Sequence, residues 1–156
     1  MGTYLNPGKT SFEEAVNSEI FIDKTEIISF LNTVVRTKQK YVSVSRPRRF
    51  GKTMAADMIC SYYDRTSDSR ALFERLNISS STSVFNKNEW DLYLGKFDVI
   101  RLVMTKFFKK SLTVEQSLDT MQRMVIRDIK KEYPDADLFN DADLLQTIED
   151  IYSQNN

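Results

Sequence analysis

The stretch "YVSVSRPRRFGKT", residues 41–53, decides the fold that this sequence predicts. Residues 41–44 form a short segment rich in β-branched side chains, which favours a strand. After Thr53, apolar side chains recur at helical spacing through about Tyr63, namely Met54, Met58, Ile59 and Tyr62. A strand, a loop and a helix therefore follow one another directly, which is the context in which phosphate-binding loops occur.

The loop ends in Gly-Lys-Thr, the last three letters of the phosphate-binding pattern G-x-x-x-x-G-K-[ST]. By that mapping Lys52 reaches the β- and γ-phosphates, Thr53 is the magnesium ligand, and a side chain at Gly51 would collide with the phosphate. Two features count against the pattern. Arg46 stands where the first glycine is expected, and Pro47 lacks a donor N–H. A chance triplet is therefore the alternative.

The rest of the chain predicts helices around a second strand. Residues 97–104, "FDVIRLVM", read as that strand, and residues 19–23 as a shorter one. Thr25 is the predicted N-cap of one helix, and Thr113 with Gln116 forms a capping box for another. A last helix is expected over 143–152. The alternation of strands and helices predicts an α/β layout with a parallel sheet.

Composition limits the classes of function. The chain has 156 residues, of which 41% are apolar, so we expect one core and a single domain over 1–156. Histidine is absent and Cys60 is the only cysteine, which excludes disulfides, Ser-His-Asp catalysis and most zinc sites. Neither a signal peptide nor an apolar run of about 20 residues is visible, so the expected compartment is cytoplasmic, without a membrane partner.

Charge is balanced in total but divided along the chain. Lys+Arg and Asp+Glu both number 22. Residues 36–53 hold seven basic side chains and no acidic one, and residues 131–156 are strongly acidic. The basic arginines can contact phosphates of a nucleotide, a nucleic acid or an acidic protein surface, or they can form internal salt bridges. An EF-hand starting at Asp135 would need Gly at Asn140 and Glu at Gln146, so we interpret the acidic segment as a solvated turn.

Several blocks resemble one known family in order along the chain: "SEIFIDKTEIISFLN", "VSRPRRFGKTMAADMICSYYD", "ALFERLNI" and "YLGKFDVIRL". They are similar to the bacterial AAA-ATPase-like domain family of P-loop NTPases, from about Leu5 to the end. The family carries an Asp-Lys-Thr block and then R-P-R-R-F-G-K-[ST], so Arg46 belongs to the family's own form of the loop. The resemblance implies ATP or another nucleoside triphosphate with Mg²⁺. The implied cofactor-binding residues are Arg46, Arg48, Arg49, Phe50, Gly51, Lys52 and Thr53, with Thr53 also at the metal.

The resemblance also shows what the chain lacks. P-loop hydrolases need a later strand ending in Asp or Asp-Glu, the Walker B carboxylates, which hold Mg²⁺ and polarise the attacking water. Residues 97–104 run into Thr105 and Lys106 without a carboxylate, and Asp23 precedes the loop. We therefore expect no catalytic residues. The expected fold is a partial P-loop NTPase-like parallel sheet flanked by helices, a three-layer sandwich truncated before its later strands.

Two functions from different classes remain open. The first is a nucleotide-phosphate-binding fragment that does not hydrolyse. The second is a stand-alone ATPase remnant, reused on a mobile element as an inhibitor of a protein–nucleic-acid complex, for example as an anti-CRISPR-type protein. The expected partners are a nucleotide, a second copy or another protein at an exposed sheet edge, and a protein–nucleic-acid complex at the basic loop.

Overall fold

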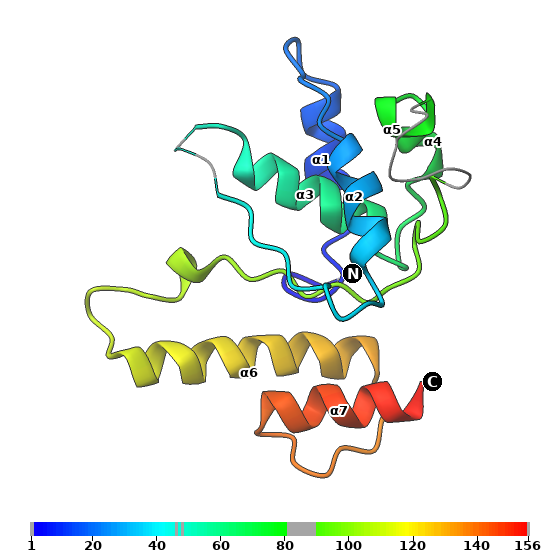
Figure 1. Ribbon diagram of the computed structural model, residues 1–156. Coiled ribbons are helices and arrows are strands. Elements are labelled where there is room, and N and C mark those ends of the chain that lie inside the picture. The colour runs from blue at the N-terminus through cyan, green and yellow to red at the C-terminus, as the bar shows by residue number, and fades with distance from the viewer. Residues whose placement is uncertain (1, 46, 48, 81–89, 156) are drawn as a thin grey trace. The chain divides into compact units, whose positions relative to one another are not determined.

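The computed structural model describes residues 2–45, 47, 49–80 and 90–155, and its regular elements there are helices (Figure 1). The chain divides into two compact units. We call Gly8–Val99 the loop unit, and Met1–Pro7 with Ile100–Asn156 the helix-pair unit. The elements in chain order are α1 (Thr10–Val16), α2 (Glu26–Val34), α3 (Lys52–Tyr63), α4 (Arg70–Phe73), α5 (Asn77–Ser80), the 3-10 helix η1 (Met104–Lys106), α6 (Val114–Glu132) and α7 (Leu144–Gln154).

The predicted parallel sheet, and with it the three-layer sandwich, is wrong. The described residues contain no β-strand, only two isolated bridges, an antiparallel one between Leu5 and Ile100 and a parallel one between Asp64 and Phe97. Residues 41–44 are exposed and form no strand, and neither do residues 19–23. β-branched residues favour a strand only where a neighbouring strand and a buried face receive them, and nothing described pairs with these segments.

The loop unit has an aromatic core that includes the second half of α3. Helix α1 packs against α3, and α5 contacts both α2 and α4 (Figure 1). The rings of Phe12 and Phe73 stack at 5.4 Å, and Tyr62 meets Phe73 edge to face at the same distance. The buried cluster comprises Phe12, Ile28, Met58, Tyr62, Tyr63, Leu72, Phe73, Leu76 and Ile78. The second half of α3 is thereby anchored in the core, while its first residues remain exposed beside the loop.

A buried polar network ties α2 to the same half of α3. The Asn32 amide donates to the Tyr62 hydroxyl at 2.8 Å, and the Tyr63 hydroxyl donates to the Asn32 carbonyl oxygen at 2.7 Å. Tyr62 in turn donates to the backbone carbonyl of Trp90 at 2.6 Å. Burial raises the pKa of Tyr62 and of Tyr63, so both hydroxyls keep their protons and act as donors.

In the helix-pair unit α6 and α7 lie side by side (Figure 1). Leu144, Ile148 and Ile151 of α7 pack against a buried cluster formed by Val125 and Ile129 of α6 and by Leu5. The predicted capping box is confirmed: the Gln116 N–H donates to the Thr113 hydroxyl at 3.2 Å, and the Thr113 N–H donates to the Gln116 side chain at 2.9 Å. Among the residues that the structure describes, no helix is long and apolar enough to cross a bilayer.

Candidate phosphate-binding site

At the end of the loop, the Gly-Lys-Thr triplet forms the start of a helix. Helix α3 begins at Lys52, and Gly51 is its N-cap with a φ of 76°. This left-handed conformation favours glycine, because a Cβ clashes there with the backbone. From the sequence, the glycine at position 51 was explained by a different reason, the close approach of a phosphate. The first N–H groups of α3 lie directly after Gly51, where a helix leaves them without intrahelical partners.

The structure places the predicted site residues around this turn as far as it describes them. The Lys52 ammonium folds back over the loop and donates to the carbonyl oxygen of Pro47 at 2.9 Å. The side chains of Arg49, Phe50 and Thr53 are exposed beside it. Arg46 and Arg48 lie outside the described residues. Lys52 is thus held against the loop by the Pro47 carbonyl, the Thr53 side chain is exposed one residue further on, and their roles at a phosphate stay predictions.

Lys24 also contacts the loop, and sequence reasoning missed it. Its ammonium donates to the carbonyl oxygen of Phe50 at 3.2 Å, across 26 residues of sequence. A Cβ placed on Gly51 would lie 3.4 Å from the Lys24 Nζ atom. The ammonium therefore occupies the space beside Gly51 that the glycine leaves open. The available signal was the Asp-Lys-Thr block itself, which contains Lys24.

The two neighbours of Lys24 hold its backbone in place. One oxygen of Asp23 accepts the N–H of Thr25 at 2.8 Å and its hydroxyl at 2.7 Å, and the other oxygen accepts the N–H of Asn77 at 2.7 Å. The buried Thr25 hydroxyl accepts the N–H of Ile78 at 3.1 Å. Thr25 does occupy the N-cap position of α2, but the predicted side-chain cap is wrong, because its hydroxyl bonds to Asp23 and α5 instead.

Comparison with protein families identifies the chain. A family model described as "Predicted AAA-ATPase" matches residues 7–156. The chain belongs to this AAA-ATPase-like family. Both the Asp-Lys-Thr block and the Gly-Lys-Thr loop lie within the matched residues. A comparison with curated proteins and one with solved structures gave no match.

The described part of this AAA-ATPase-like chain offers few protein donors to a metal. Within the described residues, no group of three or more His, Cys, Asp or Glu side chains is arranged to hold a metal ion. Mg²⁺ in nucleotide sites usually takes one or two protein oxygens and completes its shell with substrate phosphates and water. The exposed Thr53 hydroxyl fits that mode, in which the metal arrives with the nucleotide.

The acidic segment of the AAA-ATPase-like chain contributes to the packing of α6 and α7. Asp141 pairs with Lys130, whose hydrogen bond lowers the pKa of that carboxyl. Asp143 caps α7 by accepting the Gln146 N–H at 3.0 Å, and Asp150 accepts the N–H of Phe139 at 2.9 Å. These contacts are those of an acidic turn held by local hydrogen bonds.

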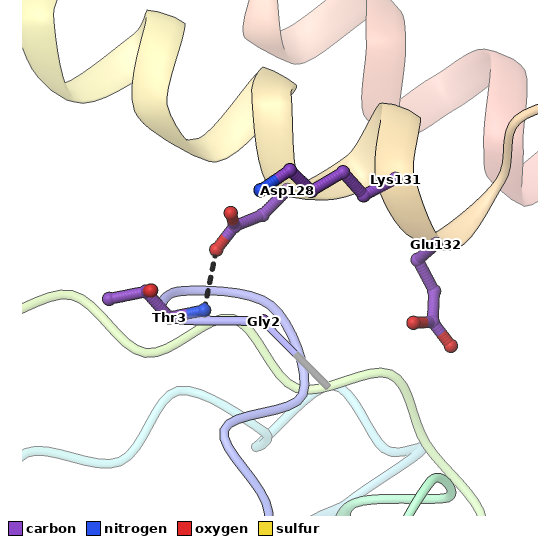
Figure 2. Close-up of a pocket in the computed structure, with 5 residues that line it drawn as sticks. All are labelled: Gly2, Thr3, Asp128, Lys131 and Glu132. Carbon is purple, nitrogen blue, oxygen red and sulfur yellow. Dashed lines mark hydrogen bonds between the residues drawn. The ribbon is translucent and has the colours of Figure 1, made fainter.

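A second polar site lies in the helix-pair unit. Figure 2 shows the Asp128 carboxylate of α6 directed at the backbone of Thr3, and the hollow around it, of about 440 Å³, is lined by Gly2, Thr3, Asp128, Lys131 and Glu132. One oxygen of the buried Asp128 accepts the N–H groups of Thr3 at 2.7 Å and Tyr4 at 2.8 Å. The carboxylate is thus a clamp that binds the N-terminal segment to α6.

The turn at Asp23 predicts a measurable loss of stability when its carboxylate is removed. Asp23→Ala leaves the N–H groups of Thr25 and Asn77 without their acceptor, so we expect the free energy of unfolding to fall by about 1–3 kcal/mol in urea denaturation. Asp23→Asn, which keeps an acceptor oxygen, should recover part of the loss. The exposed Glu19→Ala is the control and should stay within about 0.5 kcal/mol of the parent. Equal stability of Asp23→Ala and Glu19→Ala would contradict the role of the turn.

Proposed function

We propose that residues 45–53 bind the phosphates of a nucleotide, ATP or another nucleoside triphosphate, together with Mg²⁺. The observation that carries this proposal is the fold-back of Lys52 over a loop that ends at the N-terminus of α3. A helix N-terminus offers free N–H groups and a partial positive charge, both of which favour phosphate. Membership of the AAA-ATPase-like family supports nucleotide use at this loop.

Each residue of the triplet has a proposed role. Gly51 allows the turn and the close approach of the phosphate, Lys52 exchanges the Pro47 carbonyl for phosphate oxygens, and Thr53 contributes its hydroxyl to Mg²⁺. Exposed Arg49 adds a further cation, and the loop's other arginines, Arg46 and Arg48, share that assignment from the sequence.

We further propose that the bound nucleotide is not hydrolysed. Hydrolysis requires a carboxylate placed to hold Mg²⁺ and orient the attacking water, usually at the end of a strand. No strand is present among the described residues, and the sequence places no carboxylate directly after residues 97–104. Binding without turnover follows from such a donor set.

The two compact units are proposed to form one domain over residues 1–156. The family model supports this, because its match at 7–156 includes residues of both units.

The alternative function, binding to a protein–nucleic-acid complex as a reused ATPase remnant, is supported by the exposed chain before the loop. Tyr41 is 86% exposed, and Val42 and Val44 are also exposed. Basic side chains flank this segment at Lys38, Lys40 and Arg49. Such a surface fits a partner with both apolar and acidic or phosphate groups. Nucleotide binding is preferred because the Gly-Lys-Thr triplet at a helix N-terminus and the family match both favour a phosphate ligand, whereas exposed basic and apolar residues favour no particular partner.

The proposal predicts that ATP with Mg²⁺ stabilises the protein. At an ATP concentration of about ten times the dissociation constant, the free energy of unfolding should rise by about 1.4 kcal/mol. For a chain of this size that corresponds to a rise of roughly 3–6 °C in melting temperature. Lys52→Ala should remove the shift, because it deletes the charge that meets the phosphates. The exposed Lys38→Ala is the matched control and should retain it.

No thermal shift and no calorimetric heat at millimolar ATP would contradict nucleotide binding and favour the alternative. In that case Arg46, Arg48 and Arg49 changed together to Ala should weaken binding to nucleic acid or its complexes, with the salt dependence reduced by about one phosphate for each arginine engaged.

The absence of hydrolysis is tested by phosphate release. We expect release from ATP by the parent protein to equal that by Lys52→Ala at saturating nucleotide, since the sequence places no carboxylate directly after residues 97–104 to activate water. Turnover well above this background, abolished in Lys52→Ala, would show that the site holds the missing catalytic group.

A further inference from the structure

We infer that Lys24 is a second phosphate-binding residue of the loop, positioned by the Asp23–Thr25 turn, and that the ligand is therefore a polyphosphate with charge enough for two lysines. This inference rests on the proposed function and deepens it. It concerns a residue from outside the Gly-Lys-Thr pattern, brought to the loop by the fold of the chain.

The first argument is position. Lys24 Nζ lies 3.2 Å from the Phe50 carbonyl oxygen and 3.4 Å from the place where a side chain on Gly51 would begin. Phosphate needs that same space, because glycine precedes the lysine of such loops to let the phosphate approach. A phosphate bound beside Gly51 would therefore lie within reach of the Lys24 ammonium.

The second argument is the donor capacity of the ammonium group. A lysine ammonium carries three N–H donors. The Phe50 carbonyl takes one of them, and no carboxylate accompanies Lys24 in the part of the chain that the structure describes. Two donors and a full positive charge are therefore available beside the loop. A contact whose only purpose was to satisfy one exposed carbonyl would not require the charge.

The third argument is electrostatic. The N-terminus of a helix carries a partial positive charge, so cations there are unfavourable and anions favourable. Helix α3 nevertheless begins with Lys52, has no acidic residue in its first turn, and receives Lys24 beside its N-cap. An anion bound beside this helix end and the two lysines is therefore favoured electrostatically, and a polyphosphate is such an anion.

The Asp23–Thr25 turn explains why Lys24 can hold this position. Asp23 and Thr25 are each bonded to the backbone of α5, at Asn77 and Ile78, and Thr25 is fully buried. Lys24 stands between these two fixed residues with its own side chain exposed. A long side chain on a fixed backbone reaches the loop with less loss of conformational entropy than one on a free backbone. Asp23 and Thr25 are thus positioning residues and Lys24 is the binding residue.

The test is isothermal calorimetry on the full chain with Mg²⁺ and three probes: ATP, AMP and inorganic triphosphate. Lys24→Gln keeps a donor for the Phe50 carbonyl but removes the charge. Loss of a charge-assisted contact should weaken the binding of ATP and of inorganic triphosphate by about 10- to 100-fold. The affinity for AMP, which has one phosphate, should fall less. Lys24→Arg should restore most of the affinity, and the exposed Lys38→Gln should bind all three probes as the parent does.

Four results would overturn the inference. If Lys52→Gln loses triphosphate affinity while Lys24→Gln keeps it, the inference fails and the proposed function stands. If the parent binds none of the probes, both fail. Tighter binding by Lys24→Gln would show that the ammonium excludes phosphate. Equal losses in Lys24→Gln and Lys24→Arg, with a lower melting temperature of both free proteins, would show that Lys24 only supports the loop.

Discussion

The arrangement of the candidate site depends on the hydrogen bonds that the carboxylate of Asp23 accepts. This carboxylate fixes the turn into α2 through Thr25, and it binds the backbone of α5 at Asn77. Lys24, the residue enclosed by this turn, is thereby directed at the loop and meets the Phe50 carbonyl. Among the described residues, which contain no sheet, this turn joins the start of α2 to α5 and so places Lys24 against the loop.

Helix α3 divides into a fixed half and an exposed half. Its later residues lie in the aromatic core and in the network of Asn32, Tyr62 and Tyr63, so the helix axis is well supported. Its first residues, Lys52 and Thr53, are exposed. Burial at one end therefore stabilises the helix, while the other end stays exposed, as the proposed phosphate binding requires. Such a division is what a binding residue on a rigid element requires.

Local signals in the sequence predicted local structure well. The capping box at Thr113 and the helices around α3, α6 and α7 were correct, because their signals lie within a few residues of the structure that they specify. The strands at 41–44 and 97–104 were wrong, because a strand also needs a partner from elsewhere in the chain: residues 41–44 found none, whereas Phe97 and Ile100 each paired with a different one. Lys24 was missed for the same reason, since its contact with the loop spans 26 residues. The phosphate role of the triplet stays a prediction from its chemistry, and the left-handed φ of Gly51 adds a structural reason for the glycine that the pattern alone does not contain.

The most direct test of the account is an NMR titration of the labelled protein with a non-hydrolysable ATP analogue and Mg²⁺. The account predicts that the largest amide shifts fall on Gly51, Lys52 and Thr53, because a bound phosphate accepts from these N–H groups, and that the side-chain ammonium signal of Lys24 shifts with them, because the phosphate joins or replaces its contact with the Phe50 carbonyl. Shifts confined to the hollow at Thr3 and Asp128, or no shifts at a saturating concentration, would contradict a phosphate site at the loop.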